Sequence, residues 1–167
     1  MTVDKAALYA RVRTSLAALL SGETDATANL ANTAALIYDQ LPDINWAGFY
    51  LLRENELVLG PFQGKPACVR IPLGKGVCGA AVVRRSSLVV PNVHRFPEHI
   101  ACDSASRSEI VIPLSGPNHF LGVLDIDSPV ENRFDELDRA GLETLCSLLV
   151  HHLAPDGSPL SDVLCRI

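Results

Sequence analysis

The sequence predicts an α+β protein with a central six-stranded antiparallel sheet and with the N- and C-terminal helices on one face. Three observations predict this. Two segments with apolar residues at helical spacing precede the first strand, the strands are joined by hairpin-like turns, and a long amphipathic helix follows the last strand. Because these helices can cover one face of the sheet, we expect a ligand pocket on the other.

The N-terminal part of the chain predicts two helices. Residues 4–20 carry leucine and valine at helical spacing, and Gly22 is a suitable stop. Residues 26–40 repeat the pattern, and Pro42 ends the segment. Both helices therefore come before any strand.

The middle of the chain alternates between short strands and turns. "INWAGFYLLR" and "ELVLGPF" read as a hairpin, and "ACVRIPL" as a short strand. "GKGVCG" leads into a short helix that starts near Cys78, and "SLVVPN" is a further strand. Residues 93–107 show no clear period, so we predict a long loop, which in a compact domain is usually functional.

The last elements are a hairpin and a helix. "SEIVIPL" and "HFLGVLDIDS" form the hairpin, and "FDELDRAGLETLCSLLVHHL" forms an amphipathic helix capped by Asp135. We expect a single domain over residues 1–155 and a short C-terminal tail over residues 156–167.

Composition excludes several classes of protein. The chain has 167 residues, a net charge of −5 and no run of lysine or arginine, so nucleic acid and anionic membranes are not expected as partners. No apolar run is long enough to span a bilayer, and the charged N-terminus is unlike a signal peptide. Five cysteines, an odd number, do not suit a secreted disulfide framework, so we expect a cytoplasmic protein.

Three acidic residues fall on strands where alternation decides their direction. A period of two puts Asp125 and Asp127 on one face of their strand, and Glu109 can join them if the two last strands pair. The first strand can bring Trp46 and Tyr50 to one face in the same way. The simplest alternative is a merely solvated face. Carboxylates beside an aromatic wall, however, suit a small ligand that bears an ammonium group.

The cysteines divide into two groups. Cys146 lies on the apolar stripe of the last helix and Cys165 in the tail, where a small buried or inert residue is the default. Cys68, Cys78 and Cys102 lie beside glycine, proline or polar loop residues, so we expect partly exposed thiols of the redox type. A reactive thiol needs a lowered pKa, for which Arg107 near Cys102 and the helix start at Cys78 are candidates.

A zinc site is the main rival explanation of the cysteines. It would use the side chains of His94, His99, Cys102 and Cys68, but the sequence has no C-x-x-C pair. A Cys/His hydrolase is disfavoured because no nucleophile elbow is apparent. We therefore expect no metal and no cofactor.

The segments "GPFQGKPACVRIPLGKGVCGAA", "VPNVHRFPEHIACDSASRSEIVIPL" and "GVLDIDSP" resemble the free methionine (R)-sulfoxide reductases, a family built on the GAF domain. The resemblance runs from about residue 44 to residue 145. It implies a catalytic thiol at Cys102, a resolving thiol at Cys68, and Cys78 as a further family cysteine. The positions that resemble the family's substrate pocket are Trp46, Tyr50, Glu109, Asp125 and Asp127. Glu98 stands where the family pattern leads us to expect glycine.

The expected reaction follows from this resemblance. Cys102 attacks the sulfoxide sulfur while an acid, Glu109 or one of the two aspartates, delivers a proton; Cys68 then forms a disulfide that thioredoxin reduces. Cys78 is the alternative resolving thiol, and a homodimer is left open. The alternative from another class is a GAF module that binds a small ligand and signals without chemistry.

Overall fold

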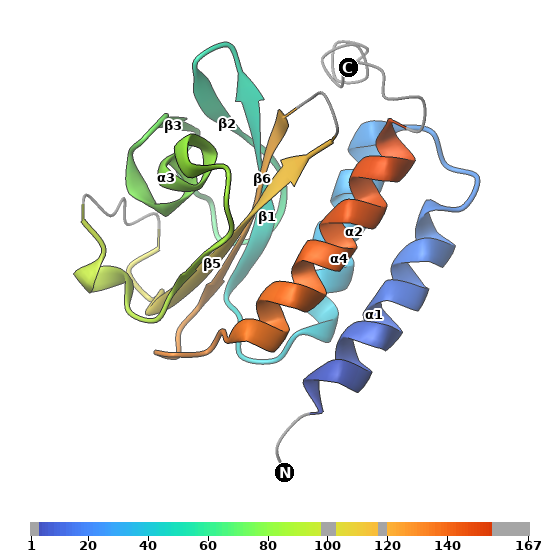
Figure 1. Cartoon of the computed structure of the whole chain (residues 1–167), viewed down its shortest axis with the longest axis horizontal. Coiled ribbons are helices and arrows are strands. Elements are labelled where there is room, and N and C mark those ends of the chain that lie inside the picture. The colour runs from blue at the N-terminus through green and yellow to red at the C-terminus, as the bar shows by residue number, and fades with distance from the viewer. Residues whose placement is uncertain (1–3, 98–102, 117–119, 155–167) are drawn as a thin grey trace.

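The computed structural model describes residues 4–97, 103–116 and 120–154, which form one antiparallel sheet with a layer of long helices on one face (Figure 1). The strand order is β3-β2-β1-β6-β5-β4, so the two hairpins meet where β1 pairs with β6. The predicted six-stranded antiparallel sheet is confirmed. Its strands are β1 (Trp46–Arg53), β2 (Glu56–Gly64), β3 (Arg70–Pro72), β4 (Leu88–Val90), β5 (Ser108–Ser115) and β6 (Phe120–Ser128).

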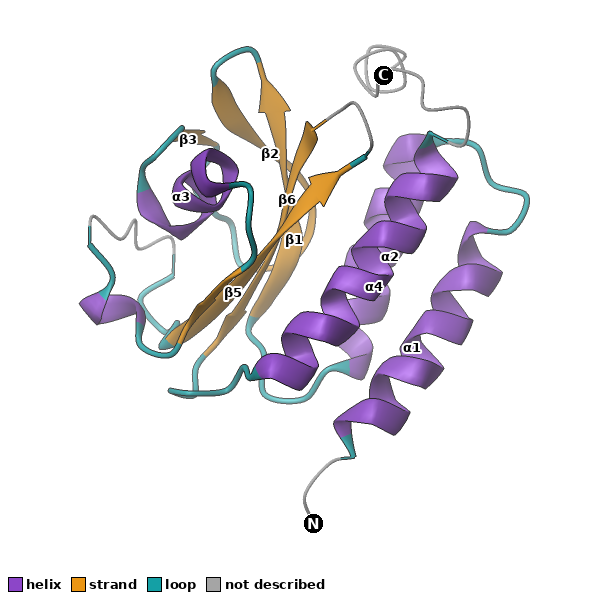
Figure 2. Ribbon diagram, viewed as in Figure 1, coloured by secondary structure: helices purple, strands orange, loops and turns teal. Residues whose placement is uncertain are grey.

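The helical layer consists of α1 (Lys5–Leu20), α2 (Ala26–Gln40) and α4 (Glu136–Leu153). Each begins at an aspartate whose side chain accepts backbone N–H groups of the first turn, which satisfies donors that a helix end leaves unpaired. Figure 2 shows these three helices on one side of the strands and the short helix α3 (Gly76–Arg84) on the other. The predicted placement of the terminal helices is therefore correct, and α3 adds cover to the opposite face.

Two hydrophobic cores follow from this arrangement. The larger one lies between the sheet and the three long helices, and it includes Phe49 of β1 and Ile126 of β6. The smaller one lies on the other face under α3, and it includes Val77 and Val111. Since successive strand residues point to opposite faces, β1, β5 and β6 each divide their side chains between the two cores.

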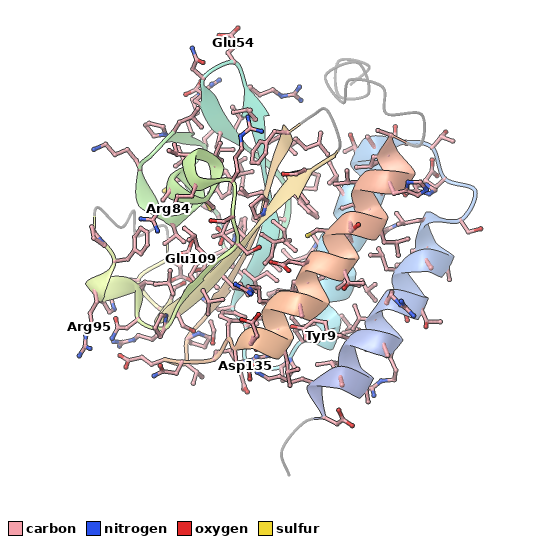
Figure 3. All side chains as sticks on the ribbon, in the orientation of Figure 1. Tyr9, Glu54, Arg84, Arg95, Glu109 and Asp135 are labelled. Atoms are coloured by element: carbon pink, nitrogen blue, oxygen red, sulfur yellow. The ribbon has the colours of Figure 1, made fainter. Side chains whose placement is uncertain are left out.

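A buried ionic cluster fastens α1 to the start of α4. The Asp138 carboxylate is fully buried and accepts a hydrogen bond of 2.9 Å from the Tyr9 hydroxyl. It also forms ion pairs with Lys5 at 2.5 Å and with Arg133 at 3.2 Å. Tyr9 lies at the end of the helical layer where α4 begins (Figure 3). Two cations and a hydroxyl thus compensate the burial of one carboxylate.

The sequence interpretation differs from the structure in two places. The predicted third strand, over residues 67–73, shrinks to Arg70–Pro72 at the edge of the sheet, where Pro72, which has no N–H to donate, is its last residue. The predicted loop over 93–107 begins with a 3₁₀ turn, Val93–Arg95, whose first residue is fully buried.

Among the described helices, none combines the length and the apolar character that crossing a membrane requires.

Candidate active site

Three carboxyl groups meet on the sheet face that α3 covers. Glu109 of β5 is directly opposite Asp127 of β6, and Asp125 lies two residues before Asp127 on the same face. Glu109 and Asp125 are each only 6% exposed, so the alternative of a solvated face is wrong for these two residues. Glu109 belongs to the side of the sheet on which α3 lies (Figure 3).

Burial raises the pKa of all three carboxyl groups well above the usual range. The pKa of Asp125 is raised further by the charge of Glu109 and by a hydrogen bond between the two side chains, and the same bond lowers the pKa of Glu109. The two carboxyl groups therefore retain a proton more readily than exposed carboxyl groups do. The pKa of Asp127 is raised by burial and by the charge of Asp125, while the Ser106 hydroxyl opposes the shift. The cluster holds protons that exposed carboxyl groups would have released.

Cys78 belongs to the same cluster, which corrects the expectation of a partly exposed, activated thiol. The residue is 3% exposed, and its Sγ lies 4.0 Å from Glu109 Oε1. Burial, followed by the charges of Asp125 and Glu109, raises the pKa of the thiol well above its ordinary value. The first turn of α3, which would favour a thiolate, is outweighed by burial and by these carboxyl groups.

Aromatic side chains of β1 and β2 form a wall beside the carboxyl groups, which consists of Trp46, Tyr50 and Phe62. The rings of Trp46 and Tyr50 are stacked at 5.9 Å, and those of Trp46 and Phe62 at 5.3 Å. Trp46 is directly opposite Asp127 in the sheet. Gly48 makes the close stacking possible, because a Cβ there would lie 2.6 Å from the Trp46 ring. The site therefore combines acidic groups with an apolar face of fixed geometry.

The same wall holds the segment that carries Cys68. Trp46 Nε1 donates to the Lys65 carbonyl at 3.1 Å, and the Tyr50 hydroxyl donates to the Cys68 carbonyl at 2.9 Å. Cys68 is half-buried and disulfide-bonded, whereas Cys78 and Cys146 are free thiols, so neither of these two is its partner. Cys146 is buried in the helical layer, as its place on the apolar stripe predicts.

A polar anchor that sequence reasoning missed fixes the chain just after Cys102. Asn45 Nδ2 donates to Asp103 Oδ2 and to Ser106 Oγ, both at 3.2 Å, and Lys65 lies 3.6 Å from Asp103 Oδ2. Asp103 also accepts the Ala105 N–H at 2.9 Å, and this bond is the largest cause of its lowered pKa. The turn-forming "DSAS" was a usable local signal. Cys102 itself, like Glu98, His99 and Cys165, lies outside the described residues.

Of the zinc set considered from the sequence, the structure describes only His94 and Cys68, so that alternative stays untested. Within the described residues, the group with metal-ligand spacing is Cys78, Glu109 and Asp125, whose ligand atoms all lie within 4.8 Å of one another. His94 is exposed on the 3₁₀ turn and is not part of that group. His99 and Cys102 fall outside the described part of the chain.

Comparison with known proteins agrees with this architecture. Residues 15–153 match the GAF domain family. The chain is 55% identical to the free methionine-R-sulfoxide reductase of Escherichia coli over 91% of this chain and 92% of that protein. It is similar to the same-named enzyme of Neisseria meningitidis, solved in complex with its substrate, with 46% identity, a TM-score of 0.87 and 92% of each chain covered. It is also similar to a GAF sensor protein of Burkholderia vietnamiensis, with 53% identity, a TM-score of 0.89 and coverage of 93% and 99%.

Proposed function

The chain belongs to the free methionine-R-sulfoxide reductase family of GAF-domain proteins, and we propose that it reduces free methionine (R)-sulfoxide to methionine. One observation carries the proposal beyond family membership. Buried carboxyl groups with raised pKa values lie against a stacked aromatic wall, and that wall is bonded to the segment of a disulfide-bonded cysteine. A GAF module that only binds a ligand does not require acidic groups with raised pKa values beside a redox-active cysteine.

Substrate recognition follows from the two kinds of side chain in the site, carboxyl groups and aromatic rings. The carboxyl groups of Glu109, Asp125 and Asp127 bind the α-ammonium of the amino acid, and Trp46 and Tyr50 pack against its side chain. An ammonium ion that enters the pocket stabilises the ionised form of these acids, which burial otherwise disfavours. In a peptide the same nitrogen is an uncharged amide. Selectivity for the free amino acid is therefore a charge requirement.

The chemistry uses the thiols in sequence. The Cys102 thiolate attacks the sulfoxide sulfur, and the oxygen accepts a proton and ends on Cys102 as a sulfenic acid, so methionine sulfur gains the two electrons that the cysteine sulfur loses. The thiol of Cys68 then condenses with the sulfenic acid, which forms a disulfide and releases water. A dithiol protein such as thioredoxin, in a reducing cytoplasm, returns both cysteines to thiols.

The Asp125–Glu109 pair is the source of the proton. The two side chains share a hydrogen bond, and both pKa values are raised by burial, so the pair keeps a proton to a higher pH than a solvated carboxyl group does. One carboxyl group can then bind the ammonium while the other acts as general acid. Glu109 and the two aspartates thus divide the roles of ligand and acid among them.

Cys68 is preferred over Cys78 as the resolving thiol. Cys68 is half-buried and disulfide-bonded in the structure, while Cys78 is free, deeply buried and has a raised pKa. A resolving thiol must meet first the sulfenic acid and then an external reductant, so it needs access. Cys78 instead lies buried beside the Glu109 carboxyl group.

The test is conversion of free methionine (R)-sulfoxide to methionine with thioredoxin as reductant. Cys102→Ser should abolish conversion, because a serine hydroxyl is too weak a nucleophile for sulfur at neutral pH. Cys68→Ser should release about one equivalent of methionine per chain and then stop with thioredoxin. Cys146→Ser is the matched control and should behave like the wild type. Normal turnover by Cys102→Ser would reject the proposal.

A further inference from the structure

Cys78, Glu109 and Asp125 form a cluster whose chemistry the proposed reaction uses only in part. One soft sulfur and two carboxyl groups come from α3, β5 and β6, and their ligand atoms lie within 4.8 Å of one another. All three residues are at least nine-tenths buried. Side chains from three separate elements are therefore held together by the fold and not by neighbouring positions in the chain.

A second observation points to a missing ligand at this place. Asp125 Oδ1 is buried and has no hydrogen-bond partner in the described part of the chain. An unpartnered buried carboxyl oxygen is destabilising, more so when it is charged, and a donor or a cation bound beside it would compensate that cost. The substrate ammonium is one such group, and a metal ion is another.

We propose that Cys78 Sγ, Glu109 and Asp125 form a binding site for a thiophilic divalent cation such as Zn²⁺, and that this cation competes with the substrate. The inference rests on the proposed function at one point only, namely that the two carboxyl groups also bind the substrate ammonium. The cation is an inhibitor that occupies the pocket and not a cofactor of the reaction.

The geometry suits this class of ion. Zinc binds thiolate sulfur at about 2.3 Å and carboxylate oxygen at about 2.0–2.2 Å, so tetrahedral ligands lie roughly 3.5 Å apart. The separation of 4.0 Å between Cys78 Sγ and Glu109 Oε1 must close by about 0.5 Å, and the three ligand atoms, which lie within 4.8 Å of one another, by at most about 1.3 Å. Hard ions such as Mg²⁺ prefer all-oxygen sites, whereas a thiolate selects softer ones. Binding replaces the S–H bond by a sulfur–metal bond and releases the proton to solvent.

Titration of the full-length oxidised protein with CdCl₂ and ZnCl₂ tests the site without any turnover. Cd²⁺ bound to a thiolate gives an ultraviolet charge-transfer band, and equilibrium dialysis gives the stoichiometry. Cys78→Ser should lose the band assigned to this site, and both Cys78→Ser and Asp125→Asn should bind at least about tenfold more weakly, since even changes behind a metal's ligands cost that much. Cys146→Ser, which removes a buried thiol elsewhere, should bind as the wild type does.

The outcomes separate the metal site from the proposed function. Wild-type affinity and band in Cys78→Ser, or wild-type affinity in a folded Asp125→Asn, would overturn the site. Free methionine sulfoxide at saturation should weaken Cd²⁺ binding to the wild type. If the variants behave as expected but methionine sulfoxide has no effect, the metal site stands, while its competition with the substrate and the assignment of the ammonium ligands are both wrong.

Discussion

Replacing Gly48 by alanine should damage the aromatic wall of the candidate site. A Cβ at this position would lie 2.3 Å from Phe62 Cβ, 2.6 Å from the Trp46 ring and 2.9 Å from Phe62 Cα. Optimal carbon contacts are about 3.5–4.0 Å, so the Trp46 ring and the backbone of β2 must move by about 1 Å. Overpacking of this kind costs about 1–3 kcal/mol. For a chain of this size, we expect Tm to fall by about 2–12 °C.

The same displacement should weaken catalysis, which distinguishes it from a general loss of stability. A shift of 1 Å in a positioning group can cost as much as about a hundredfold, so we expect kcat/KM for free methionine sulfoxide to fall at least about tenfold. Gly22→Ala is the matched control, because Gly22 has φ of +83° and no atom within 4 Å of a Cβ. It should lower Tm through backbone strain alone. An unchanged Tm in Gly48→Ala, or equal losses of kcat/KM in both variants, would refute the reasoning.

Asp125→Asn should lower kcat/KM by about tenfold to about a hundredfold, which corresponds to the loss of a charge-assisted contact of about 1.5–3 kcal/mol. In competing-substrate assays, the ratio of kcat/KM for free to N-acetylated methionine sulfoxide should be smaller for this variant than for the wild type. Tyr9→Phe removes a hydrogen bond to the buried Asp138 carboxylate, so denaturant unfolding should show a loss of about 1.5–3 kcal/mol with kcat unchanged. Lys65→Ala should change kcat/KM by less than about fivefold, because the Lys65 side chain that pairs with Asp103 is 72% exposed and exposed ion pairs contribute little. A larger loss would mean that Lys65 contacts the substrate.

The sequence predicts the parts of the site that depend on local geometry. Strand alternation places Asp125 and Asp127 on one face because the period of two is a property of the backbone, and pairing of the last two strands adds Glu109. Helical spacing predicts the three long helices for the same reason, and the Asp135 cap predicts the start of the last one. Both kinds of pattern are contained within a few consecutive residues.

Features that depend on packing between distant segments could not be predicted in this way. The burial of Cys78 is set by how α3 lies on β5 and β6, and a glycine-rich flank in the sequence gives no sign of it. The anchor of Asn45 on Asp103 joins residues 58 positions apart. The close approach of β2 to Gly48 also depends on the folded hairpin, so the sequence does not predict it. The family resemblance, not residue patterns, assigned Cys102 its role.

The single tryptophan of the chain gives the molecule an internal optical reporter. Trp46 is buried, is stacked against the rings of Tyr50 and Phe62, and donates from its indole nitrogen to the carbonyl of Lys65, three residues before Cys68. Indole emission depends on the polarity and the hydrogen bonding around the ring, so its wavelength and intensity report on this one point of the fold. Reduction of the Cys68 disulfide and entry of an amino acid into the pocket should each change the emission. Every chain therefore carries, without a label, a fluorescence signal with which both events can be followed in real time.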